Sequence, residues 1–101
     1  MKSIPLKSLP DERFPNDPAG TIEYAQVLRD VVRRPLNPQA GVNIAEMRQS
    51  LRVLDAIEAA SGTLELEDAD YAHLTEKLAA MQWSVVDRRI LQLIEDVSAA
   101  S

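Results

Sequence analysis

The residue types that could perform acid–base chemistry in this chain centre on a single histidine. His73 lies within one helical turn of Asp70 and Lys77, and a general base also needs a nucleophile and an orienting partner within reach. The chain has no cysteine, and no Ser-His-Asp or Cys-His arrangement can be assembled from the spacing. We therefore expect His73 to be a partly exposed structural residue and the protein not to be an enzyme.

Carboxylates that could bind a divalent cation gather at Glu65, Glu67, Asp68 and Asp70. A calcium loop needs oxygen ligands at fixed offsets, a glycine for its sharp turn and a trailing glutamate, and this stretch lacks the last two. Carboxylates also stabilise the first turn of a helix through its dipole. We expect that second role, and we predict no metal site and no cofactor.

Arginines give the first half of the chain a basic character. Residues 1–60 balance eight basic against eight acidic side chains, whereas residues 61–101 hold three against eight, for a net charge of −5. Three interpretations stay open for the arginines: a solvated face, an ion-paired interface with an acidic partner, or phosphate contacts by a helix–turn–helix pair. The arginines concerned are Arg29, Arg33, Arg34, Arg48 and Arg52.

Four amphipathic patterns predict the helices that would position these residues. Apolar residues recur at helical spacing over 21–34, 44–60, 68–81 and 85–99. Thr21, Asn43 and Ser84 are suitable N-caps for the first, second and fourth helices. Trp83, in the turn between the last two helices, either plugs the core or anchors an interface.

The first 20 residues predict an extended arm. Their prolines, at 5, 10, 15 and 18, leave no room for a helix of ordinary length. Apolar residues in this segment favour an arm that lies on its own domain or on a partner; a disordered leader is the alternative. Thr63–Leu66 alternates polar and apolar residues, which suits either one short β-bridge or an extended connection, and the arm is the only candidate partner for a strand here.

Composition completes the predicted fold. Aromatic residues are 4% of the chain and hydrophobic residues 46%, so the core must be built from aliphatic side chains, which favours helix. We expect an all-α fold: a compact four-helix bundle in a single helical domain over 21–101, with the arm over 1–20 and at most one short β segment. No apolar run is long enough to cross a membrane and no signal peptide is evident, so a cytoplasmic protein is expected.

Four stretches together resemble small proteins encoded among the virion assembly genes of tailed phages and prophages: Phe14–Pro18, Gly41–Arg48, Arg52–Asp55 and Leu64–Tyr71. The resemblance carries no catalytic motif. It implies a non-enzymatic role in assembling or connecting virion parts, in the host cytoplasm or in the virion.

The function expected from the sequence is therefore that of a protein-interaction module, with a protein partner such as a virion component. It would act through the apolar N-terminal arm and an exposed face of the second helix. The basic and acidic halves of the chain also suggest a homo-oligomer. A DNA-binding regulator that uses the first two helices is the alternative, although the acidic charge makes nucleic acid an unlikely partner. The predicted partner-binding residues are Ile4, Leu6, Leu9, Phe14, Arg48, Arg52 and Trp83.

Overall fold

The computed structural model describes residues 1–14 and 16–101, and within the described part the chain forms helices and two small sheets. Pro15, one of the prolines of the predicted arm, lies outside the described residues. The helices are α1 (Tyr24–Arg33), α2 (Ile44–Ala59), α3 (Asp68–Ala80) and α4 (Arg88–Ser98), with a short 3-10 turn, η1, at Pro18–Gly20. The strands are β1 (Lys2–Pro5), β2 (Ser8–Leu9), β3 (Ile22–Glu23) and β4 (Thr63–Leu66).

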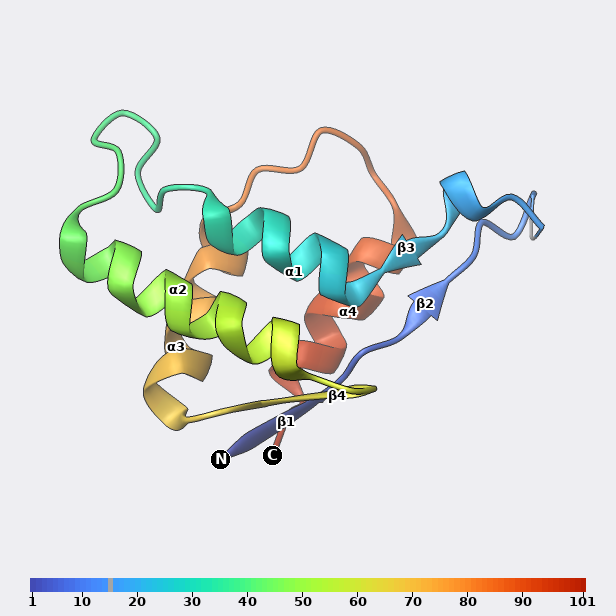
Figure 1. Ribbon diagram of the computed structural model, residues 1–101. Helices are drawn as coiled ribbons and strands as arrows, with labels where there is room; N and C mark the ends of the chain where they lie inside the picture. The colour runs from blue at the N-terminus through green and yellow to red at the C-terminus, as the bar shows by residue number, and fades with distance from the viewer. Residues whose placement is uncertain (15) are drawn as a thin grey trace.

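The predicted all-α fold is wrong, because the N-terminal segment forms strands. β1 pairs with β4 and β2 pairs with β3, each pair antiparallel. The prolines that exclude helix from this segment still permit extended backbone, and extended backbone needs hydrogen-bond partners. The result is a mixed α/β protein in which α1 and α2 lie side by side in front of α3 and α4 (Figure 1).

The arm lies on its own domain. Ile4 is opposite Leu64 and Lys2 is opposite Leu66 in the β1–β4 register, and Ile4, Leu64 and Leu66 are all buried. β1 is therefore the partner strand that the alternation over Thr63–Leu66 required. Both chain ends lie near this sheet (Figure 1), and the amide of Ser3 donates to the carbonyl of Ser101 at 3.2 Å.

Helix boundaries follow the capping residues. Asn43 caps α2 as predicted, since its side chain accepts from the amide of Glu46 at 2.8 Å. α1 begins at Tyr24 and not at Thr21, because Ile22–Glu23 pairs with β2. α4 begins at Arg88 and not at Val85, because Asp87 takes the N-cap position and accepts from the amide of Arg89.

Arg89 ties the start of α4 to the N-terminal segment. A positive charge in the first turn opposes the helix dipole, so the charge of Arg89 needs a compensating partner. That partner is Asp87, which receives a hydrogen bond of 3.1 Å from Nε and one of 2.8 Å from Nη2. Nη1 donates to the carbonyls of Leu9 and Gly20, which holds β2 close to the turn before β3.

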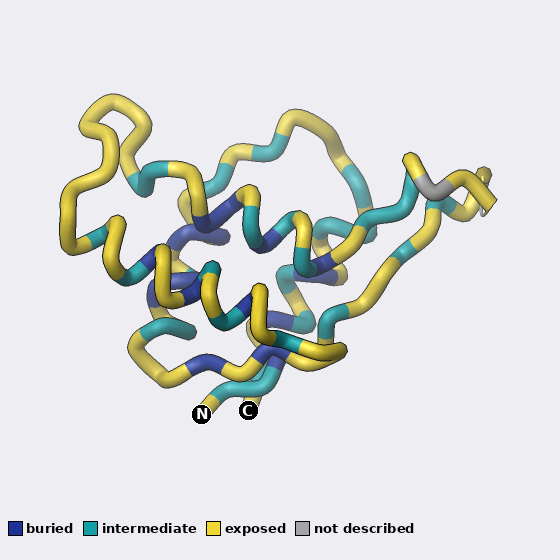
Figure 2. The backbone as a smooth tube through the Cα atoms, in the orientation of Figure 1, coloured by how far each residue is buried: buried dark blue, intermediate teal, exposed yellow. Residues whose placement is uncertain are grey.

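The core is aliphatic apart from Tyr24, and it is continuous between the helices and the β1–β4 sheet. Trp83 packs against it while only partly buried. Buried segments line the inside of the helices and of β4 in Figure 2, and exposed segments alternate with them along α2. The buried apolar residues are Ile4, Tyr24, Leu28, Val31, Val32, Val53, Ile57, Leu64, Leu66, Leu74, Leu78, Leu93 and Val97.

Candidate protein-interaction surface

α2 is apolar on two opposite sides. Its inner side buries Val53 and Ile57 in the core. Its outer side carries Ile44, Met47 and Leu51, whose exposed fractions are 69%, 50% and 50%. Residues three and four apart lie on one helical face, so these three form a continuous stripe that the described part of the chain leaves uncovered.

A hollow of about 190 Å³ lies beside the stripe, between α2 and the end of α1. Its walls are mainly apolar, and Met47 and Leu51 belong to both the stripe and the hollow. The stripe and the apolar residues that line the hollow from α2 and the segment just before it together form what we call the α2 surface. The α2 surface consists of Val42, Ile44, Met47, Leu51 and Leu54. The other residues that line the hollow are Val32, Arg33, Ser50 and Lys77.

Charged side chains border the α2 surface in an ordered way. Arg48 and Arg52 are exposed on one flank of the helix, and Arg33 is exposed on α1 beside the hollow. Asp55 and Glu58 are exposed on the last turns of α2. The border is therefore basic along the early and middle turns of α2 and acidic along its last turns.

A buried ion pair fixes α2 against α3 and the end of α1. Nζ of Lys77 lies 2.7 Å from Oε2 of Glu46, with the two side chains 2% and 11% exposed. Lys77 also donates to the carbonyl of Arg34, and the amide of Leu36 donates to Glu46 at 3.2 Å. These bonds lower the pKa of Glu46, with the hydrogen bond from Lys77 as the largest cause.

A second buried polar contact joins the same helices. Oγ of Ser50 and Nε2 of His73 lie 2.9 Å apart, and both residues are buried. Burial lowers the pKa of His73, and the nearby charge of Lys77 lowers it further. His73 is thus more buried than predicted.

The predicted partner-binding residues are dispersed. Ile4 is fully buried in the core, and Leu6 and Leu9 are partly buried against it. Phe14 is 61% exposed, in the loop between β2 and β3. Of the residues predicted, only Arg48 and Arg52 lie beside exposed apolar side chains of the same element. The sequence did contain the signal for the remainder of the site: an apolar face on α2 too wide for one neighbour.

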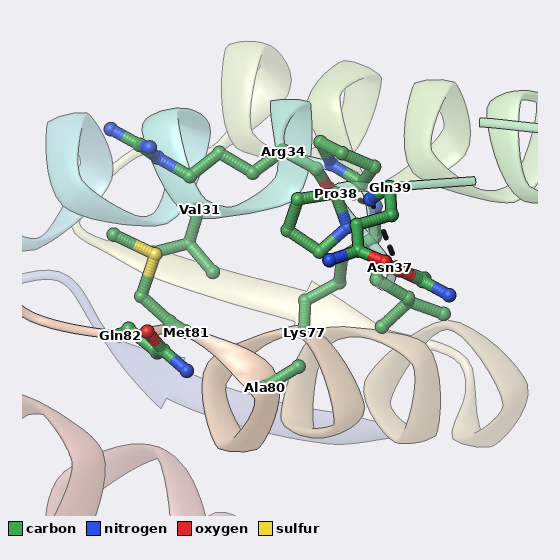
Figure 3. A pocket seen from close by; sticks show the side chains of 11 residues that line it. Val31, Arg34, Asn37, Pro38, Gln39, Lys77, Ala80, Met81 and Gln82 are labelled. Carbon is green, nitrogen blue, oxygen red and sulfur yellow. Dashed lines mark hydrogen bonds between the residues drawn. The ribbon is translucent and has the colours of Figure 1, made fainter. Parts of the chain in front are cut away.

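A larger hollow, of about 480 Å³, lies between the end of α1, the following loop and the end of α3. Figure 3 shows Arg34, Pro38 and Gln39 on one side of it and Lys77, Ala80 and Met81 on the other. The ammonium group of Lys77 is already bound by Glu46 and by the carbonyl of Arg34. This hollow therefore offers no free buried charge with which to recognise a ligand.

The described residues contain no group of three His, Cys, Asp or Glu side chains placed to hold a metal ion. Nor does any helix in the described part have the length and apolar character needed to span a membrane. Comparison with known protein families, with characterised proteins and with solved structures found no match to this chain. The resemblance to small phage proteins therefore stays a prediction.

Proposed function

We propose that this protein is a non-enzymatic interaction module and that its α2 surface binds an amphipathic helix of a partner protein. The observation that carries the proposal is the uncovered stripe of Ile44, Met47 and Leu51 beside an apolar hollow. Large apolar side chains that gather on one helix face lose contact with water when a second apolar helix covers them, and this burial favours association.

The charges around the stripe indicate what kind of helix fits. Arg33, Arg48 and Arg52 border the α2 surface. A partner helix with carboxylates beside its apolar stripe would place opposite charges against these guanidinium groups, which favours association and selects against basic helices. The partner that we propose is therefore an amphipathic helix with acidic flanks.

Buried polar contacts support this function by giving α2 a fixed position. The Lys77–Glu46 pair and the Ser50–His73 contact both join α2 to α3. Because these contacts hold the helix from its inner side, the outer stripe is presented without rearrangement. A pre-organised surface of this kind binds with a smaller entropy cost than one that must first become ordered.

The alternative of DNA binding by α1 and α2 has less support. Asp55 and Glu58 are exposed on the same helix as Arg48 and Arg52, and carboxylates next to a phosphate backbone oppose binding. Assembly of virion parts, which the resemblance implies, is the setting that we propose for the interaction. It requires contacts between proteins and no catalysis.

The test uses a fluorescent synthetic helix with leucines at positions i, i+3, i+4 and i+7 and glutamates on both flanks. Fluorescence anisotropy of this peptide should rise on titration with the full chain. A peptide with lysines in place of the glutamates should bind at least tenfold more weakly. Equal affinity for the two peptides, or no binding of either, would contradict the proposal.

A pair of variants locates the binding site. Leu51→Lys places a charge in the centre of the α2 surface and should weaken peptide binding at least tenfold. Leu91→Lys makes the same change on α4, at a leucine of similar exposure, 55% against 50%. That control should bind the peptide like the unmodified protein. A larger loss from Leu91→Lys than from Leu51→Lys would place the binding site elsewhere.

A further inference from the structure

We infer that the helix that covers the α2 surface is α2 of a second copy of this chain, packed antiparallel across a two-fold axis. The inference rests on the proposed function and names its partner. α2 itself has the features that the proposed partner helix needs, because it combines an exposed apolar stripe with the exposed carboxylates of Asp55 and Glu58.

The order of charges along α2 favours the antiparallel direction. Arg48 and Arg52 lie in its middle turns, and Asp55 and Glu58 lie toward its C-terminus. A parallel pair would bring the arginines of the two copies together, and likewise their carboxylates. An antiparallel pair brings the basic part of each copy against the acidic part of the other.

Residue spacing sets the register of this pair. Arg48 and Asp55 are equally far, about 5 Å along the helix axis, from the point between Leu51 and Arg52, since each residue rises by about 1.5 Å. A two-fold axis through that point places Arg48 level with Asp55 of the second copy. The same axis places Ile44 level with the exposed Ala59 of the second copy, which leaves room for the larger side chain.

The flanks of the helix agree with this register. Arg48 and Asp55 are seven residues apart and so lie on nearly the same side of α2. A two-fold axis perpendicular to two adjacent antiparallel helices keeps like flanks together. Two equivalent Arg48–Asp55 ion pairs then form on one side of the contact, and the Leu51 side chains meet near the axis.

The contact closes on itself, so it predicts a dimer and not a filament. Arg52 lies beside the axis, where Arg52 of the second copy approaches. The repulsion between the two Arg52 side chains opposes pairing. Asp55 of the second copy, which lies about one helical turn from Arg52 in this register, has to balance it. A single helix pair with this balance is small, so we expect a dimer in exchange with monomer at micromolar concentrations.

Sedimentation velocity of the full chain, over a range of concentrations, measures this equilibrium. Arg48→Asp and Asp55→Arg should each weaken dimerisation at least tenfold, because each replaces two attractive pairs with two repulsive ones. The double variant Arg48→Asp/Asp55→Arg restores both pairs with their charges exchanged, so its dissociation constant should return to within about threefold of the unmodified protein. No recovery in the double variant would overturn the register.

A cross-linking experiment tests the position of the axis. The chain has no cysteine, so a single introduced cysteine reports one site. Leu51→Cys should form a disulfide-linked dimer on mild oxidation, whereas Leu91→Cys, the matched exposed position on α4, should not. Equal cross-linking by the two variants would overturn the proposed contact.

Two outcomes distinguish a missing contact between two copies from a missing interaction surface on α2. A chain that stays monomeric up to 1 mM, yet binds the glutamate-flanked peptide through Leu51, would overturn the second copy as partner and leave the interaction surface in place. A monomeric chain that also ignores the peptide would overturn both.

Discussion

The ammonium group of Lys77 lies 2.7 Å from the carboxylate of Glu46, and the lysine side chain is almost wholly shielded from water. Thirty-one residues separate the two in sequence. Charges removed from water are costly unless they are paired and hydrogen-bonded. In this protein the amide of Leu36 also donates a hydrogen bond to Glu46, and Lys77 donates one to the carbonyl of Arg34. It therefore joins α2, α3 and the segment after α1 at one point.

Removing one member of this pair should be far more damaging than removing both. Glu46→Ala leaves the ammonium group of Lys77 buried without a counter-charge, and we expect it to lower the free energy of unfolding by about 3 kcal/mol or more. Glu46→Ala/Lys77→Met removes both charges and should therefore lose less stability than Glu46→Ala alone. Urea unfolding measures the free energy of unfolding of the single and double variants, with the exposed Glu58→Ala on the same helix as a control. Additive losses would show that the two side chains do not interact.

Stability should fall as the pH drops below about 7 because of His73. Burial lowers its pKa in the folded state, whereas in the unfolded chain a histidine takes up its proton near pH 6.5. As the pH falls through that value the unfolded state gains a proton that the folded state does not, so stability falls by up to about 1.4 kcal/mol per pH unit. His73 is the only histidine, so His73→Gln should largely remove this dependence. Urea unfolding of both proteins at pH 7 and pH 5.5 measures this dependence. An equal loss of stability in the two proteins would contradict the role of His73.

The N-terminal strand should be essential to the fold. Ile4 is fully buried opposite Leu64, and truncation of a buried isoleucine to alanine costs about 2–5 kcal/mol. Ile4→Ala should lower thermal stability accordingly, whereas Phe14→Ala, at an exposed aromatic, should change it little. Unchanged stability in Ile4→Ala would show that β1 does not pack on the core in solution.

Arg89 should stabilise the β2–β3 region more than its neighbour Arg88 does. Arg89 binds Asp87 with two hydrogen bonds from its guanidinium group and donates to two carbonyls of the N-terminal segment, whereas Arg88 is exposed. Arg89→Ala should lower the free energy of unfolding by about 1–3 kcal/mol and speed amide exchange in β2 and β3. Arg88→Ala should do neither. Equal effects from the two variants would argue against this link.

The sequence predicted the helices well because their signals are local. The 3.6-residue spacing of apolar residues and the cap at Asn43 are written within a few residues of each helix. Gly62 takes a positive φ of 77° in the turn between α2 and β4, a backbone conformation that favours glycine. The ends of α1 and α4 were less predictable, because a competing strand at Ile22–Glu23 and a competing cap at Asp87 decide them.

The sheets and the buried polar contacts could not be predicted in the same way. β2 and β3 have two residues each, too few for an alternating pattern to be recognised. Ser50 and His73 are 23 residues apart, and a single sequence contains no local pattern that pairs such side chains. Among the predicted interaction residues, Ile4 belongs to the core and Phe14 is exposed, while the exposed stripe of Ile44, Met47 and Leu51 lies on α2.

Chemical-shift mapping tests the central claim most directly, because it locates the contact residue by residue. Amide spectra of the ¹⁵N-labelled full chain would be recorded during titration with the glutamate-flanked helix. The account predicts that the largest shift changes fall within residues 42–55 and at the end of α1 near Arg33, and that Leu51→Lys abolishes them. Changes centred on residues 82–92, or none at saturating peptide, would contradict it.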